Sequence, residues 1–174
     1  MQTRPNYIIL DGAKMQLSLE KAKELNPQHQ CLFQGNQAKN MGGAAPWLFT
    51  YSVNAPLAQW LLEESKEQNW GVLFYSQQPL EIIAQHLLKL LSAQTSIGQQ
   101  YYFRYYDPRV LNAFLPNCSV DQLHAFFGPI ASFFSETTND YLFHYSIHPN
   151  QNALQKETIT RANFFQKGGI RIVG

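Results

Sequence analysis

Short apolar runs alternate with amphipathic stretches along the first two-thirds of the chain. Runs with the length and composition of buried β-strands lie at 7–10 (YIIL), 47–52 (WLFTYS) and 70–76 (WGVLFYS). Helices are predicted at about 13–26, 54–67 and 79–92, where apolar and polar positions separate onto two faces. The polar, glycine-bearing segment at 34–46 predicts a loop. This order is typical of a sheet covered by helices.

An aromatic run and two signals for helix starts come next. The run at 99–106 (QQYYFRYY) predicts a strand. Asp107, held in an extended conformation by the proline after it, predicts the N-cap of a short helix. Ser119 and Gln122 have the spacing of a capping box, which predicts another helix.

The end of the chain predicts a hairpin and a tail. The apolar segments at 130–134 and 141–147 are separated by a polar turn, which is typical of a β-hairpin. The more polar segment from residue 150 predicts one helix before the final run at 168–174. With 174 residues, we expect one domain of mixed α/β (α+β) class: a mixed sheet flanked by helices, with a core at 1–135 and a C-terminal hairpin and tail extension at 136–174.

The composition limits the function classes. Charged residues make up only 14% of the chain and the formal net charge is +1, so no long-range attraction to nucleic acid or to an anionic membrane is expected. No apolar run approaches the ~20 residues of a membrane span. The two cysteines are far apart, and no secretory signal is recognisable, which predicts a cytoplasmic protein. The 12 Phe, 9 Tyr and 3 Trp predict a surface for a protein partner.

The aromatic run also holds the main candidate site residues. Alternation along a strand would place Tyr102, Arg104 and Tyr106 on one face, with Arg104 able to stack on the tyrosines. A covered arginine needs a carboxylate, and Asp11 at the end of the first predicted strand is the candidate partner. Arg109 is a cation in a first helical turn, where it opposes the helix dipole, so it too requires a specific partner.

The strand predicted at 141–147 supplies the other candidates. Alternation places Tyr141, Phe143 and Tyr145 on one face and His144 with His148 on the other, so one face is expected to enter the core and one to remain for a partner. The two histidines would be ~13 Å apart, too far to share a metal ion. No nucleophile, metal or cofactor signature is present. We therefore expect no catalysis, no cofactor and no metal.

The order of these landmarks resembles a family of type VI secretion effector chaperones, also called adaptors. The segments that carry the resemblance span about residues 7–134 and include YIILDGA, APWLF, NWGVLFYS and, most specifically, FRYYDPRVL. The chain has HLL at 86–88, where the family often has His-Leu-Arg. The resemblance implies a bacterial cytoplasmic protein that binds one toxic effector and helps load it onto the valine-glycine-repeat (VgrG) spike without catalysing a reaction. The open alternative is a nucleic-acid-binding or enzymatic domain whose site is assembled from distant residues.

Overall fold

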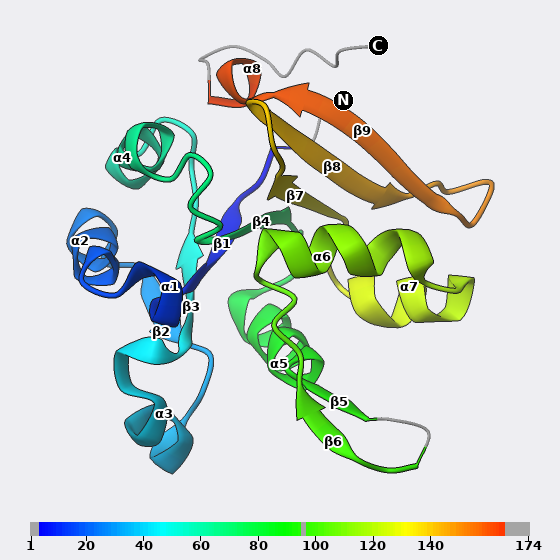
Figure 1. Ribbon diagram of the computed structural model, residues 1–174, viewed down its shortest axis with the longest axis horizontal. Helices are drawn as coiled ribbons and strands as arrows, with labels where there is room; N and C mark the ends of the chain where they lie inside the picture. The colour runs from blue at the N-terminus through cyan, green and yellow to red at the C-terminus, as the bar shows by residue number, and fades with distance from the viewer. Residues whose placement is uncertain (1–3, 95–96, 166–174) are drawn as a thin grey trace.

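A seven-stranded sheet with the order β2-β3-β1-β4-β7-β8-β9 crosses the molecule (Figure 1). The computed structural model describes residues 4–94 and 97–165. Every pair of neighbouring strands in this sheet is antiparallel. Its strands are β1 (Tyr7–Asp11), β2 (His29–Cys31), β3 (Pro46–Thr50), β4 (Gly71–Tyr75), β7 (Ser132–Glu136), β8 (Tyr141–Ile147) and β9 (Leu154–Thr160). A separate two-stranded hairpin consists of β5 (Ser92–Gln94) and β6 (Gln100–Tyr102).

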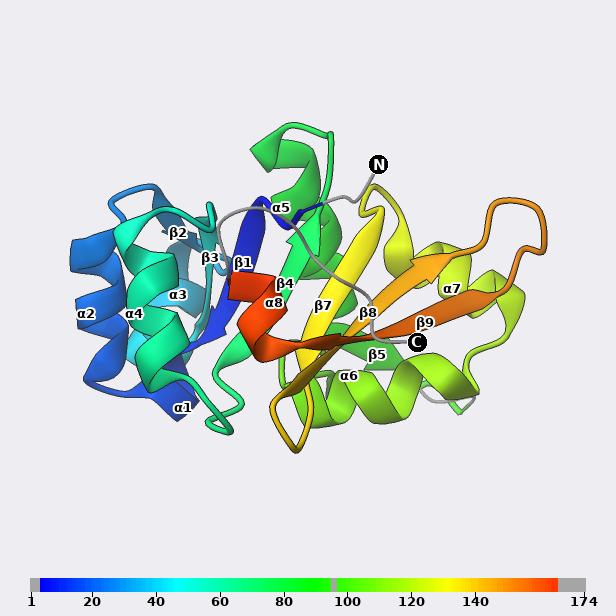
Figure 2. The same cartoon turned by 90° about the horizontal axis from the view of Figure 1, so that it is seen from above.

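Helices cover both faces of the sheet, which gives three layers (Figures 1 and 2). One face packs against α1 (Gly12–Met15), α2 (Ser18–Leu25), α4 (Pro56–Glu64) and α8 (Arg161–Phe165). The other face packs against α5 (Leu80–Leu90), α6 (Pro108–Phe114) and α7 (Val120–Phe127). β1 shows the pattern, because Ile8 and Leu10 enter the first core and Ile9 enters the second. Both faces of the central strands are therefore buried.

The predicted fold class is confirmed, with one difference in the sheet. The structure is a mixed α/β domain, and its β7–β8 hairpin pairs Ser132 with Ser146, as the two apolar segments predicted. The capping box of Ser119 and Gln122 at the start of α7 is also present. The sheet is antiparallel rather than mixed, because the helices that separate the early strands return the chain to neighbouring strands in the opposite direction.

Two predictions for the first third of the chain are wrong. The helix expected at 13–26 is two helices, α1 and α2, because Gln16 adopts a positive φ of 51° and ends the first of them. The segment expected to be a loop at 34–46 contains α3 (Gly35–Met41) and a 3-10 turn (Gly42–Ala44). Since α3 buries none of its residues, it has no apolar periodicity by which the sequence could reveal it.

The helix expected after residue 150 is mainly a strand. β9 pairs along its whole length with β8, from Tyr141 opposite Thr160 to Ile147 opposite Leu154. Charged residues are usual on such an edge strand, and they made the segment look helical. Only α8 follows it as a helix, and the run at 168–174 lies outside the described residues. The C-terminal strands thus continue the same sheet as β1 and β4.

Within residues 4–94 and 97–165, no helix combines the length and the apolar character that crossing a membrane requires.

Candidate functional site: two buried aspartates beneath two surface arginines

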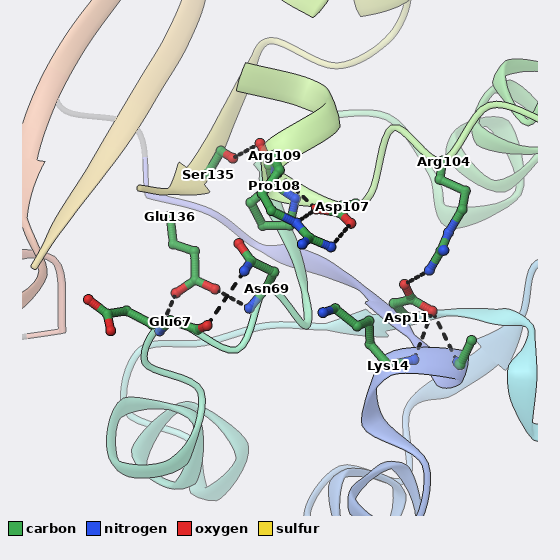
Figure 3. A network of polar contacts seen from close by, with 11 residues as sticks. Asp11, Lys14, Glu67, Asn69, Arg104, Asp107, Pro108, Arg109, Ser135 and Glu136 are labelled. Carbon is green, nitrogen blue, oxygen red and sulfur yellow. Dashed lines mark hydrogen bonds and ion pairs between the residues drawn. The ribbon is translucent and has the colours of Figure 1, made fainter. Parts of the chain in front are cut away.

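Asp11 joins β1, an inner strand of the sheet, to the loop that follows β6. It is the last residue of β1 and the N-cap of α1, and its Oδ1 accepts hydrogen bonds from the amides of Ala13 (3.0 Å) and Lys14 (3.2 Å). Its Oδ2 forms an ion pair with the guanidinium of Arg104, as the sequence predicted (Figure 3). The expectation that the pair joins adjacent strands is wrong, because Arg104 lies after the end of β6 and β6 belongs to a separate sheet. Both oxygens of this carboxylate are thus engaged, one by a helix start and one by a cation.

A second aspartate repeats this arrangement at the start of α6. Asp107 is the N-cap of α6, as predicted, and its Oδ1 accepts a hydrogen bond from the amide of Arg109 at 3.0 Å. The Arg109 guanidinium donates to both carboxylate oxygens, from Nε to Oδ1 at 3.0 Å and from Nη2 to Oδ2 at 2.7 Å. Arg109 therefore has the partner that its position in a first helical turn requires, and the pair has the bidentate geometry typical of arginine and carboxylate.

The two ion pairs are buried on the acidic side and exposed on the basic side. The side chains of Asp11 and Asp107 are 0% and 6% exposed, whereas those of Arg104 and Arg109 are 43% and 62% exposed. Burial acts to raise the pKa of Asp107, but the hydrogen bonds and charge of Arg109 outweigh it and hold this pKa below its usual value. The site therefore presents guanidinium groups to its surroundings and keeps the compensating carboxylates inside.

The tyrosines of the aromatic run are arranged differently from the prediction. β6 ends at Tyr102, and a turn with a hydrogen bond from the Asp107 amide to the Arg104 carbonyl follows it, so residues 103–106 do not alternate between two faces. Tyr105 and Tyr106 are both buried. The expected cluster nevertheless forms, because the hydroxyls of Tyr102 and Tyr106 are 2.9 Å apart and the Arg104 guanidinium lies 5.9 Å from the centre of the Tyr106 ring.

The candidates on β8 lie elsewhere, and Phe143, His144 and Tyr145 are covered on both faces of the strand, so no free face forms around them; only Tyr141 at the start of β8 is exposed. β8 is separated from β1 by β4 and β7. Tyr145 is buried and donates a hydrogen bond to Asn112 on α6, while the Lys156 amino group lies 3.7 Å from the centre of the Phe143 ring. On the opposite face His144 stacks on Phe134, with ring centroids 4.5 Å apart. The antiparallel partner β9 occupies the edge of β8 that the sequence left open.

His144 has an acidic neighbour on β9. Its Nδ1 lies 2.9 Å from a carboxylate oxygen of Glu157, which is directly opposite it in the sheet. His148 lies beyond the end of β8, where its ring accepts hydrogen bonds from the amides of Asn150 and Gln151. Across residues 4–94 and 97–165, no group of three or more His, Cys, Asp or Glu side chains has the proximity that metal binding requires.

Two further polar residues, Glu136 and Arg161, are largely buried, and the sequence analysis did not identify them. Glu136, the last residue of β7, accepts hydrogen bonds from the amides of Glu67 (3.1 Å) and Asn69, which fixes the turn before β4 (Figure 3). Arg161 at the start of α8 donates to the carbonyls of Leu61 and Leu62 at the end of α4. Burial raises the pKa of Glu136 and lowers that of Arg161. These contacts attach the C-terminal elements to the core, and no sequence motif indicated them.

An open apolar pocket of about 460 Å³ lies beside the hairpin. It is lined by residues of the β2–α3 connection, α3, the C-terminal end of α5 and β6: Phe33, Gln37, Leu88, Leu91, Ser92, Tyr101 and Tyr102. Tyr101 and Tyr102 are 53% and 42% exposed, which is unusual for large apolar side chains. Part of the aromatic excess in the sequence thus appears at the surface on β6, while on β8 Tyr141 is 37% exposed.

Comparison with known families identifies the chain at family level. The model of a domain of unknown function, DUF4123, matches residues 6–125, which is more than half of the sequence. The chain belongs to the DUF4123 family. This family is associated with type VI secretion effector adaptors, in agreement with the resemblance seen in the sequence. Neither the curated proteins nor the solved structures contain a match to the chain.

Both ion pairs lie inside the DUF4123 match, whereas β7, β8 and β9 lie beyond it. In this DUF4123 chain the FRYYDPRVL segment contributes to the fold in three ways. Arg104 pairs with Asp11, Asp107 caps α6, and Tyr105 and Tyr106 are buried in the core. Much of the segment is therefore needed for folding. The guanidinium groups of Arg104 and Arg109 remain partly exposed to solvent.

Proposed function

We propose that the chain is a type VI secretion effector adaptor. In this role it binds one cognate toxic effector in the bacterial cytoplasm and helps to load that effector onto the VgrG spike. It acts by binding alone and catalyses no reaction. The observation that carries the proposal is membership of DUF4123, whose matched stretch includes both arginine and aspartate pairs.

The surface chemistry supports a binding role. Exposed tyrosines and arginines are enriched at the centres of protein interfaces, and this chain places both near the hairpin and the start of α6. The carboxylates of Asp11 and Asp107 are engaged by helix amides and arginines, an arrangement that serves to hold side chains in place. Because these side chains are already ordered, they lose less conformational entropy when a partner binds.

The test is co-expression of the chain with candidate toxin and VgrG proteins. We expect a tagged chain to retain the untagged toxin through gel filtration, and the pair to retain VgrG. The soluble yield of the toxin should rise when the chain is present. A toxin that is soluble alone, fails to bind the chain and reaches VgrG without it would contradict the proposal. Size and mass measurements on the purified complex would then give its stoichiometry.

A further inference from the structure

Acidic and basic residues are unevenly distributed along this chain. No Asp or Glu occurs between Glu24 and Glu63, and between Glu81 and Asp121 the only one is Asp107. These two stretches contain α3, the C-terminal half of α5, the β5–β6 hairpin and the loop to α6, which lie together in the lower part of Figure 1. Since Asp107 is buried, the described residues of these stretches present no carboxylate at the surface.

Cations from the same segments are exposed. They are Lys39 on α3, Lys89 near the end of α5, Arg104 in the loop after β6 and Arg109 on α6. The formal charge of the whole chain is only +1, so this excess of positive charge is local. A local excess of one sign favours a partner of the opposite sign and raises the rate of its association.

The apolar pocket is bordered by the two helices that carry Lys39 and Lys89. Gln37, which lines it, is on the same helix as Lys39, and Leu88, which also lines it, is adjacent to Lys89 in α5. The ring of Phe33 stacks on Tyr102 with centroids 6.2 Å apart and closes one side. The pocket therefore combines an apolar floor with basic residues on the helices that form its walls.

The pocket is also connected to the arginine site. Tyr102 lines the pocket, and its hydroxyl contacts that of Tyr106 at 2.9 Å. The Tyr106 ring in turn lies 5.9 Å from the Arg104 guanidinium. Arg104 is held by the buried carboxylate of Asp11, so its outward N–H groups have a fixed orientation. A fixed guanidinium is well suited to bind a carboxylate with two parallel hydrogen bonds.

We propose that this surface, defined by Phe33, Lys39, Lys89, Tyr101, Tyr102 and Arg104, binds an acidic peptide segment that also carries apolar side chains. The apolar side chains occupy the pocket, and the carboxylates meet Arg104, Lys39 and Lys89. The inference deepens the proposed adaptor function and rests on it for the identity of the partner, which is the effector. A nucleic acid fits less well, because stacking on two tyrosines would leave the leucines of the pocket without an apolar partner.

The first experiment uses short fluorescent peptides and the whole purified chain. One peptide alternates Glu with Leu and Ser, and its matched control has Gln at every Glu position. We expect fluorescence anisotropy to show that the Glu peptide binds at least about tenfold more tightly than the Gln peptide. Equal affinities, or no binding of the Glu peptide at millimolar protein, would overturn the proposal. Tighter binding of a single-stranded oligothymidylate than of the Glu peptide would overturn it in favour of nucleic acid.

The second experiment reverses charges on the chain. The double variant Lys39→Glu, Lys89→Glu changes two exposed residues of the surface, and we expect it to weaken the Glu peptide about tenfold or more. The double variant Lys21→Glu, Lys66→Glu changes the net charge equally, on α2 and in the turn after α4, and should bind as the unmodified chain does. Circular dichroism verifies that both variants fold. Equal effects of the two variants would show a general charge effect and overturn the proposal.

The same variants separate this inference from the proposed function. If the Lys39→Glu, Lys89→Glu chain still retains the toxin in co-purification, the adaptor function stands and the acidic-segment site is wrong. If the unmodified chain binds the Glu peptide through this surface but never retains the toxin or VgrG, the site stands and the adaptor function is wrong.

A Tyr101→Ala variant tests the apolar part of the surface, because Tyr101 is largely exposed and its loss should weaken binding of the Glu peptide without unfolding the chain.

Discussion

Replacing Arg104 with alanine should destabilise the fold, because it leaves the carboxylate of Asp11 buried without its cation. Asp11 is fully buried at the end of β1, an inner strand of the sheet. Removing one partner of a fully buried ion pair costs about 3–5 kcal/mol. The side chain of Arg104 is 43% exposed, so water screens this pair and reduces the expected loss to about 1–3 kcal/mol. For a chain of this size, each kcal/mol lowers the melting temperature by roughly 2–4 °C.

Urea denaturation followed by circular dichroism measures this loss, and a double-mutant cycle with Asp11→Ala assigns it to the pair. We expect a coupling energy between the two positions of about 0.5–3 kcal/mol. Arg109→Ala is the comparison, because Arg109 is more exposed and Asp107 retains its bond to the backbone amide, so the loss should be smaller. An unchanged midpoint for Arg104→Ala, or a coupling within error of zero, would refute a structural role for Arg104 and leave it to the interface alone.

Three further predictions concern stability. The pKa of Asp107 is lower in the folded than in the unfolded chain, so its ionised carboxylate stabilises the fold fully above the unfolded pKa of about 4. This stabilisation is lost as the pH falls through the folded pKa. Asp107→Asn should therefore flatten the decline of the unfolding free energy below about pH 4 in acid titrations. Gly12→Ala would place a Cβ 1.9 Å from the carbonyl oxygen of Gly43, so thermal melting should show a loss of about 1–3 kcal/mol or more, and a neutral result would show that this connection can move. Ser119→Ala removes the capping box of α7 and should cost about 0.5–2 kcal/mol, whereas Ser119→Asp should retain most of the stability.

Much of the fold was predictable where the type of side chain depends directly on burial or on a local hydrogen bond. The apolar runs identified β1, β3 and β4, because strands buried on both faces have few polar positions. The pairing of Asp11 with Arg104 was predictable because a covered arginine requires a carboxylate, and Asp11 ended a buried strand. The cap by Asp107 followed from local chemistry before a proline.

The remaining features depend on contacts between residues that are far apart in the sequence, or on local sequences that fit more than one structure. β9 is polar because it is an edge strand, and its pairing with β8 alone makes it a strand. The turn after Tyr102 was hidden because six aromatic and basic residues in succession satisfy a strand pattern equally well. The pocket at Phe33 and Tyr101 arises from segments almost seventy positions apart, so only the folded chain brings its walls together.

The position of β4 in the sheet has a consequence for synthesis on the ribosome. One edge of β4 pairs with β1, and the other pairs with β7, which begins ~57 residues after β4 ends. At about 5–20 residues per second, roughly 3–11 seconds pass before that partner emerges. During this interval an apolar strand edge is open to pairing with other nascent chains. A fragment limited to the matched stretch, residues 6–125, would keep this edge open permanently, and we expect it to aggregate where the full chain does not.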